Sequence, residues 1–292
     1  MPMSFNQAII EEFRTNGGEV GGPFEGGDLL LLTTTGARTG QDHTVPLGYV
    51  RADGLLLVVA SAAGAPDHPQ WYRNLLAHPV VRVELGAEAF EAVAVPAEGA
   101  RRDRLFEAVV RAAPGYGDYQ AHTARVLPVV ALERSGAEPR EVADLAGKLL
   151  EVHTWLRAQL RHVRAETEAH FAAGPAGDGR PPGLGLQIRQ HCLALCAGLT
   201  HHHTGEDAAI FPALARSHPH LRETLARLGE EHRSVGRIKD GLVKLLAGIG
   251  VAEPERFRAE LARMSAELEA HLDHEERELL PVLAGIPFPP GR

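Results

Sequence analysis

Two histidine–carboxylate pairs in the second half of the chain have the spacing of residues that share one face of a helix. In "LTHHHTGEDAAIFPAL", His202 precedes Glu206 by four residues, and in "HLDHEERELLPVL", His271 precedes Glu275 by four. Residues four apart on an α-helix point about 40° from each other, so each pair can present an imidazole and a carboxylate to the same neighbour. These ligands together suit iron or manganese, although a single such pair is more often a solvated ion pair.

The two remaining helical segments of this half each carry a candidate ligand. They are His153 in "EVHTWLR" and His232 in "GEEHRSV". Apolar residues surround both at helical spacing, which indicates side chains that face a core. Paired carboxylates on facing helices of a bundle are the arrangement that bridges two metal ions. The four segments together therefore predict a metal site inside a helical bundle.

Three neighbouring histidines have weaker claims. His191 lies eleven residues before His202, about 20° from it around a helix, and it is either a ligand or an ordinary buried, hydrogen-bonded histidine. We favour the second interpretation. For His201 and His203 we expect exposure to solvent or a position behind the ligands.

Helical patterns fill the second half of the chain. Apolar residues recur at helical spacing from Leu145 to Val163, and the segment ends at a Gly/Pro cluster over 173–183. Three further helical stretches are expected over 184–215, 220–246 and 254–284. Four helices with short connections predict an all-α antiparallel four-helix bundle.

The first half is predicted to contain strands. Six short β-rich runs, including "DLLLLTTT", "TVPLGYVR" and "VVRVEL", surround only two helical segments, at 70–77 and 100–112. This pattern does not fit a doubly wound α/β fold and favours a small antiparallel barrel. The chain is then a multidomain α+β protein, with a barrel domain over 1–136 and a bundle domain over 137–292.

Two loops of the predicted barrel could bind a ligand. The glycines of "GARTG", residues 36–40, allow backbone N–H groups to turn toward an anion, and Arg38 adds a forked cation. Farther on, a strand ends at Ser61 in small residues that permit close approach of a planar ring. The following helix carries Trp71, which either lines that site or only anchors the helix to the barrel.

Composition and charge exclude several classes of protein. The net charge of −8 and the lack of a basic stripe argue against nucleic-acid binding. No apolar run approaches the roughly 20 residues of a membrane span, and Glu11 and Glu12 interrupt any signal peptide, so we expect a cytoplasmic protein. The two cysteines, Cys192 and Cys196, are expected to pack as small apolar groups.

The loops of the first half belong to a longer match. "GARTGQ", "GAPDHPQWYRNL" and "PGYGDYQ" resemble the deazaflavin-dependent nitroreductase family over about Phe5 to Arg134. The resemblance implies a split β-barrel that uses coenzyme F420, an 8-hydroxy-5-deazaflavin, to reduce a small electron-poor acceptor such as a quinone, an enone or a nitro compound. It implies three groups of site residues. The coenzyme phosphate and acidic tail would contact Arg38, Thr39 and Gly40. The ring and linker would be lined by Ser61, Ala63, Gly64, Trp71 and Asn74, and the catalytic hydrogen-bond or proton donors on the substrate side would be Ser61, Tyr116 and Tyr119.

The second half is similar to another family. "EVHTWLR", "HHHTGEDAAIFPAL" and "HLDHEERELLPVL" resemble the hemerythrin-like, or HHE cation-binding, family over about Leu145 to Leu283. The resemblance implies a bundle that holds two iron ions, or manganese, and that binds or senses oxygen or a relative such as nitric oxide. By position, it implies a ligand set in which Glu206 and Glu275 bridge the ions: His153, His202, Glu206, His232, His271 and Glu275.

Two positions depart from the oxygen-carrying members of that family. A second histidine there follows the third-helix histidine by four residues, where this chain has Gly236. The last carboxylate there lies five residues after its histidine, which would select Glu276 rather than Glu275. One iron is then less fully ligated by protein, which argues against reversible oxygen carriage and leaves room for sensing or peroxide chemistry.

The two resemblances together suggest a joint function. We predict a deazaflavin-dependent oxidoreductase that delivers electrons to a non-haem diiron centre or to a molecule bound there. Two alternatives stay open at this stage. In one, the bundle is a sensor of oxygen, nitric oxide or iron that regulates the barrel or a partner without turnover. In the other, the barrel has lost its coenzyme and serves as a binding or dimerisation module. Related split barrels commonly dimerise, so a homodimer is also expected.

Overall fold

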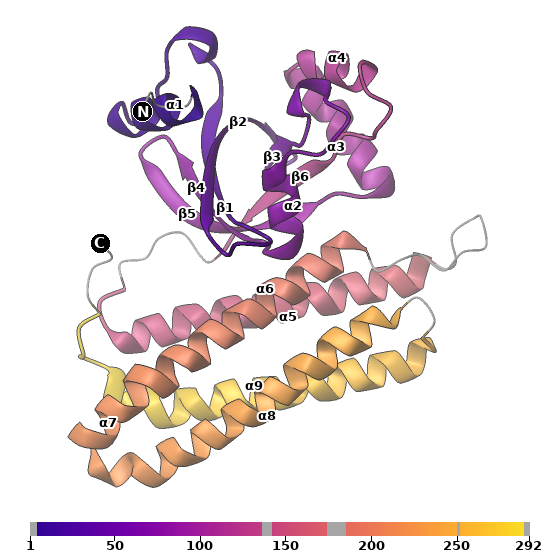
Figure 1. Cartoon of the computed structure of the whole chain (residues 1–292). Coiled ribbons are helices and arrows are strands. Elements are labelled where there is room, and N and C mark those ends of the chain that lie inside the picture. Colours follow the sequence, from indigo (N-terminus) through magenta and orange to yellow (C-terminus); the bar gives the residue numbers. More distant parts are fainter. Residues whose placement is uncertain (1–4, 136–141, 174–184, 250–251, 289–292) are drawn as a thin grey trace. The chain divides into compact units, whose positions relative to one another are not determined.

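The structure, a computed structural model of the 292-residue chain, describes residues 5–135, 142–173, 185–249 and 252–288. Its contacts divide the chain into two units, Met1–Ser135 and Gly136–Arg292, and each is described by itself (Figure 1). The predicted boundary after residue 136 and nearly all of the predicted Gly/Pro cluster lie outside the described residues.

The first unit is built on a closed antiparallel barrel of six strands, which confirms the predicted fold class. The barrel order is β1-β2-β3-β6-β5-β4, and every neighbouring pair is antiparallel. The two-residue turn between β2 and β3 uses Asp53 and Gly54, both at positive φ, as a tight hairpin requires. The strands are β1 (Leu29–Thr35), β2 (Asp42–Ala52), β3 (Leu55–Val59), β4 (Val80–Leu85), β5 (Glu88–Pro96) and β6 (Val129–Arg134).

The four-leucine run of β1 packs on both faces of the barrel wall. Leu30 and Leu32 point into one buried cluster, whereas Leu29 and Leu31 pack in another. This alternation follows from the two-residue period of a strand, and burial on both faces explains the unbroken apolar run.

Helices cover the barrel wall, and two of them were not predicted. The helix α1 (Phe5–Thr15) buries Ile9 and Phe13 against β1, and α4 (Gly115–Ala121) is a short helix with two glycines. The predicted helices appear as α2 (Gln70–Ala77) and α3 (Gly99–Ala112). Two short 3₁₀ turns, η1 (Gly22–Phe24) and η2 (Ala62–Gly64), complete the unit.

The second unit is a bundle of long helices (Figure 1). Two apolar clusters stabilise it. One contains Leu156, Leu195 and Leu272, and the other contains Leu228 and Leu279. Along the chain, His153, His202 and His232 each lie between residues of the two clusters, and His271 lies within the first. The elements are α5 (Leu145–Ala173), α6 (Leu186–Gly205), η3 (Glu206–Ile210), α7 (Phe211–Ser217), η4 (Pro219–Leu221), α8 (Arg222–Ala247) and α9 (Pro254–Leu283).

A π-helical turn, η3, joins α6 to α7 directly after the histidine-rich stretch. Pro212 lies in the first turn of α7, where it lacks an N–H and its ring would clash with the carbonyl four residues earlier in a regular α-helix. The wider π turn accommodates this proline. Turns of this kind are frequent at functional sites because they redirect the side chains on either side.

Among the helices of the described residues, none is long and apolar enough to cross a membrane.

Candidate functional site

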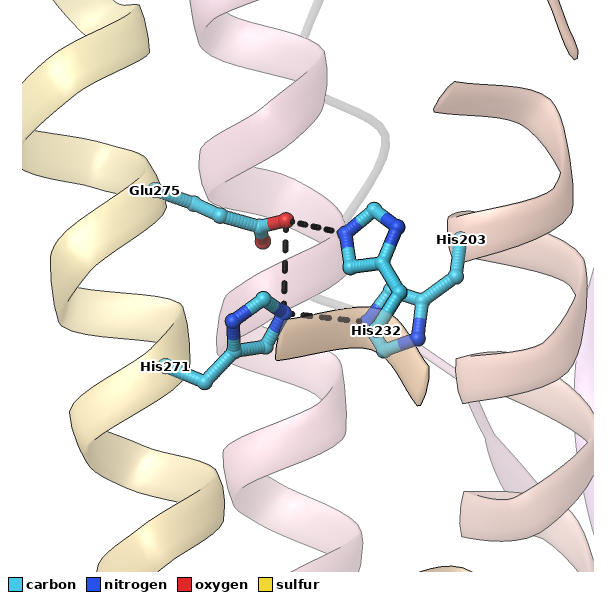
Figure 2. A group of neighbouring side chains, drawn as sticks. All are labelled: His203, His232, His271 and Glu275. Carbon is cyan, nitrogen blue, oxygen red and sulfur yellow. Dashed lines mark hydrogen bonds and ion pairs between the residues drawn. The ribbon is translucent and has the colours of Figure 1, made fainter. Parts of the chain in front are cut away.

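Three histidines and one carboxylate from three helices converge in the bundle core. His232 Nε2 lies 2.7 Å from Glu275 Oε1, and His271 Nε2 lies 3.3 Å from the same oxygen. His203 Nε2 lies 3.3 Å from His271 Nε2. All four residues are buried, and Figure 2 shows them around one small volume. They form the first ligand group.

A second group uses the other oxygen of the same carboxylate. His153 Nε2 lies 3.2 Å from Glu275 Oε2 and 3.0 Å from His202 Nε2. His202 Nε2 lies 3.5 Å from Glu275 Oε2. Glu206 Oε2 lies 3.5 Å from both His202 Nε2 and His232 Nε2, so it stands between the two groups. Glu275 belongs to both groups, and this is the geometry of a carboxylate that bridges two ions.

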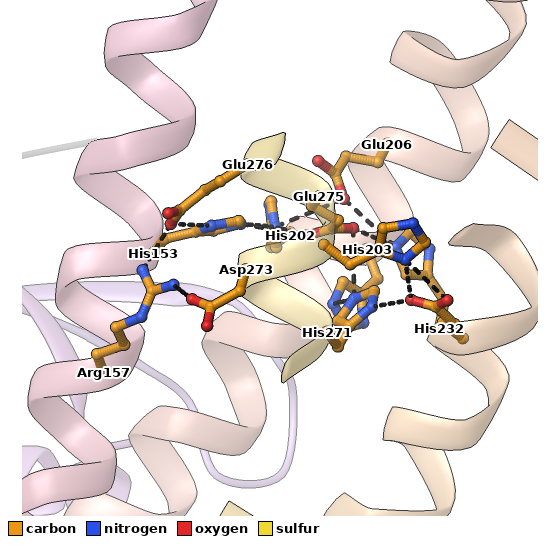
Figure 3. A network of polar contacts seen from close by, with 12 residues as sticks. His153, Arg157, His202, His203, Glu206, His232, His271, Asp273, Glu275 and Glu276 are labelled. Carbon is orange, nitrogen blue, oxygen red and sulfur yellow. Dashed lines mark hydrogen bonds and ion pairs between the residues drawn. The ribbon is translucent and has the colours of Figure 1, made fainter. Parts of the chain in front are cut away.

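Carboxylates outside the core hold three of these imidazoles by their other nitrogen. His153 Nδ1 lies 2.9 Å from Glu276 Oε1, and His232 Nδ1 lies 2.9 Å from Asp207 Oδ1. His271 Nδ1 lies 3.0 Å from Glu231 Oε2. An Nδ1–H that donates to a carboxylate leaves the Nε2 lone pair directed inward, which is the outer support that metal-binding histidines require (Figure 3).

Burial and neighbouring charges shift the pKa values of several groups in this core. Burial lowers the pKa of His203 to about 2, so its imidazole stays neutral. Burial and the neighbouring Glu275 carboxylate raise the pKa of Glu206 well above its ordinary value. Glu206 Oε2 and Glu275 Oε2 are both buried without a hydrogen-bond partner. The neutral imidazole of His203 and the orphaned carboxylate oxygens fit metal ions, which would satisfy these lone pairs and carry the opposite charge.

In the first unit, the predicted anion-binding loop borders a cavity of about 440 Å³. Arg38 and Thr39 line it, together with His43 and Arg73, and no carboxylate is among its lining residues. Asp42, which the sequence places close to this loop, lies 3.4 Å from the hydroxyl of Thr35. The cavity is therefore cationic, which suits a phosphate or an acidic tail.

Asn74 fixes this loop to the barrel. Its buried side chain accepts hydrogen bonds from the backbone N–H of Ala37 at 3.2 Å and from Gln70 Nε2 at 2.9 Å. It donates to the hydroxyl of Thr34 at 3.1 Å. The left-handed φ of +66° at Gly40 completes the turn. Asn74 thus positions the loop as well as lining the cavity.

The predicted ring-binding loop has an unusual backbone. Ala62 and Ala63 have φ values of 45° and 51°, a region that costs an L-residue about 1–2 kcal/mol. Arg125 stabilises the loop by donating to the carbonyls of Ala60 (3.0 Å), Ser61 (2.6 Å) and Ala65 (2.8 Å). Strained backbone conformations that specific contacts hold in place, as the Arg125 guanidinium does here, are typical of functional sites.

The three predicted aromatic residues occupy different places. Trp71 is 7% exposed and packs in the barrel core, edge-on to Tyr72. Tyr116 lines a second cavity, of about 460 Å³, and its hydroxyl lies 3.4 Å from the Gly48 carbonyl oxygen. Tyr119 is 38% exposed, and its carbonyl would lie 3.2 Å from a Cβ added at Gly64. The structure therefore brings Tyr119 close to the 61–64 loop, whereas the Tyr116 cavity is lined by different residues from the Arg38 cavity.

Comparisons with known proteins agree with this two-part architecture. The model of the F420H(2)-dependent quinone reductase family matches residues 7–134, and that of the hemerythrin HHE cation binding domain matches residues 144–283. Over 126 residues the chain is 40% identical to the F420H(2)-dependent quinone reductase Rv1261c of Mycobacterium tuberculosis (strain ATCC 25618 / H37Rv), an alignment that covers 42% of this chain and 85% of that protein. The chain belongs to the F420H(2)-dependent quinone reductase family. Its second half is a hemerythrin HHE domain.

Two other similar proteins match the quinone reductase domain. A putative F420H(2)-dependent quinone reductase, Rv3178, of the same strain is 35% identical over 103 residues, which are 35% of this chain and 87% of that protein. A solved structure of an F420-H2 dependent reductase (FDR-A) is 39% identical and covers 36% of this chain and 94% of its own, with a TM-score of 0.34. Both family predictions from the sequence are confirmed.

Within the HHE domain, sequence reasoning missed one residue of the core cluster. His203, for which solvent or an outer position was expected, is buried and belongs to the first ligand group. The sequence feature that could have predicted this is the position of His203 directly after His202. The core-facing stripe of a bundle helix is at least about 100° wide, so two successive residues can both face the core.

The structure places the residues of two open alternatives in different surroundings. Glu275 lies among the imidazole Nε2 atoms, whereas Glu276 contacts the Nδ1 of His153 and accepts from Arg157 at 2.6 Å. His191 lies outside the cluster, with its Nδ1 2.9 Å from Gln159 Oε1.

In the quinone reductase domain, the sequence did not predict the role of Arg125, since it is a lone arginine in "HTARVLP".

Proposed function

We propose that the HHE domain holds a dinuclear metal centre bridged by Glu275 and Glu206. The observation that carries this proposal is that both oxygens of one buried carboxylate face separate groups of histidines. Two iron ions, or manganese, fit five imidazoles and two carboxylates. When bound, such a pair would exchange electrons and offer free coordination positions to a small molecule such as oxygen or nitric oxide. The ligands of the proposed centre are His153, His202, His203, Glu206, His232, His271 and Glu275.

The chain's own residues would tune this centre. Glu231, Asp207 and Glu276 fix the ring orientation of the histidines that they contact, and Arg157 holds Glu276 in turn. Apolar clusters on both sides limit the contact of the ligands with bulk water. These features would give the site high affinity and a defined geometry.

We also propose that the barrel reduces a quinone-type acceptor with reduced coenzyme F420, which supplies a hydride when bound. The membership of the family supports this activity. The cationic cavity lined by Arg38 and Thr39, with Gly40 in the same loop, would hold the phosphate and acidic tail. Ser61, Ala63 and Gly64 would border the ring. Tyr116 or Tyr119 would donate a hydrogen bond to the acceptor oxygen as negative charge develops there. Trp71 would support the site by anchoring α2 to the barrel, and Asn74 by fixing the 36–40 loop.

Two measurements on the whole chain test these activities. Protein purified without a histidine tag should contain about two irons per chain after aerobic iron reconstitution. Absence of bound metal under these conditions would refute the proposed centre. Separately, reduced F420 should lose electrons to menadione in a stopped-flow assay, monitored by the return of oxidised F420 absorbance. No reaction with any quinone, enone or nitro acceptor would leave the barrel as a binding module.

We further propose that the two domains exchange electrons. One reduced F420 carries two electrons and would convert two ferric ions to two ferrous ions, releasing protons to solvent. Anaerobic mixing of reduced F420 with the diferric protein tests this step. Intramolecular delivery predicts a first-order rate, after coenzyme binding, that does not change with protein concentration. A rate that rises with protein concentration would indicate collision between chains, and no reduction would favour the sensor hypothesis.

A further inference from the structure

A small pocket connects the surface of the HHE domain with the first ligand group. It has a volume of about 200 Å³ and lies between residues of α6 and α8. His203 and His232 contribute to its lining, and so do Thr200 and Gly236. At about 30 Å³ for each water molecule, a pocket of this size holds several water molecules or a small ligand of comparable volume.

Gly236 borders this pocket and is not needed for helix packing. A Cβ added there would meet nothing within 4 Å. By contrast, a Cβ at Gly198 would lie 2.2 Å from Trp155, and one at Gly241 would lie 2.9 Å from Met264. A glycine in a helix interior costs about 0.8–1 kcal/mol relative to alanine. Gly236 therefore weakens α8 with no packing benefit, and what it provides is open space beside the ligands.

The charges around this pocket favour an anion. Arg233 and Lys239 contribute cations. Arg233 also lies 3.6 Å from exposed Glu230, whereas Lys239 Nζ donates to the Thr200 hydroxyl at 3.1 Å. The one carboxylate of the lining, Asp207, lies 2.9 Å from His232 Nδ1.

A second pocket of about 260 Å³ reaches the same ligand group from the α8–α9 side. His271 lines it beside Glu231 and Glu267. Its two carboxylates would repel an anion and attract a cation. The two routes to one ligand group thus differ in electrostatic character, and anions would use the route beside Gly236.

We propose that the pocket beside Gly236 admits small anions of a few atoms to the metal held by His203, His232 and His271, and that Lys239 and Arg233 select for negative charge. This inference rests on the proposed metal centre. Gly236 provides the space, and the two cations raise the local concentration of the anion. The departure from the oxygen-carrying family members at this position then has a function: it replaces a ligand by an access route.

The test uses azide as the probe on the diferric full-length protein. Azide association is followed by stopped-flow absorbance of its charge-transfer band. Gly236→Leu should fill the pocket and slow azide association by about tenfold or more. Ala226→Leu is the matched control, since Ala226 is an exposed residue of α8 that does not line the pocket.

A variant that removes one charge distinguishes the effect of charge on anion entry from the effect of pocket volume. Lys239→Gln should slow azide association several-fold at low salt and should weaken its salt dependence, while nitric oxide association with the diferrous protein stays unchanged. Metal content is measured first in each protein. Wild-type protein without metal would refute the metal centre itself. Variants with full metal content and wild-type azide rates would overturn only the proposed access route.

Discussion

The two domains position their candidate residues by different physical means. In the HHE domain, seven side chains from α5, α6, η3, α8 and α9 converge on a buried core. In the quinone reductase domain, the candidate residues lie mainly on loops at strand ends, such as 36–40 and 60–65, and hydrogen bonds from Asn74 and Arg125 hold these loops.

This difference decides which substitutions should affect ligand binding in each domain. A helix fixes the direction of each side chain by its regular repeat, so a metal ligand is supported by the whole bundle, and its removal affects the bound ion directly. A loop takes its shape from a few specific contacts. The residues that hold a loop should therefore matter as much as those that touch the ligand.

The largest effect is expected at the shared carboxylate. Glu275→Gln keeps the shape but removes the charge from both ligand groups, so metal content should fall from about two ions per chain to well below one. Mass spectrometry of metals and the ultraviolet–visible spectrum measure this. Glu276→Gln is the neighbouring control, and since Glu276 only supports His153, it should weaken metal affinity by about 10–100-fold while leaving both sites available. Two tightly bound ions in Glu275→Gln would exclude the bridging role.

Adjacent histidines give the next test. His203→Asn removes one imidazole from the first ligand group, so we expect loss of one ion of the pair or a large drop in its affinity. His201→Asn changes an exposed neighbour on the same helix and should bind metal as the wild type does. Identical metal content and spectra in both variants would show that His203 is not a ligand.

The overall folds of both domains were predictable from the sequence because periodicity reports burial. The alternation of apolar and polar residues in β4 and the helical spacing of apolar residues in α5 predicted the barrel and the bundle. The short α4 was missed because its two glycines weaken any helical pattern. The position of His203 depended on the width of the core-facing stripe, which spacing between two residues does not describe. The role of Arg125 depended on a contact with residues about 60 positions away, which no local pattern contains.

A smaller effect is expected in the barrel at Asn74. Asn74→Ala removes three hydrogen bonds, two of which hold other elements to the side chain, so unfolding free energy should fall by about 1–3 kcal/mol and F420 affinity should weaken. Calorimetry and fluorescence titration with F420 measure the two effects. Gln70→Ala removes only one donor to Asn74 and should change both quantities less. Unchanged F420 affinity in Asn74→Ala would show that the conformation of the 36–40 loop does not contribute to coenzyme binding.

The smallest effect is expected at the strained turn of the 60–65 loop. Ala63→Gly relieves a left-handed conformation worth about 1–2 kcal/mol but adds about 0.5–1 kcal/mol of chain entropy to the unfolded state, so the barrel should gain only about 0.5 kcal/mol. The neighbouring Ala60 is fully buried and is not among the described residues with positive φ, so Ala60→Gly should instead destabilise the barrel. The shift of the barrel transition in calorimetry distinguishes the two signs. Stabilisation by Ala63→Gly with weaker F420 binding would mean that the strained turn is kept for the coenzyme, whereas destabilisation would mean that the backbone of this loop is not under strain.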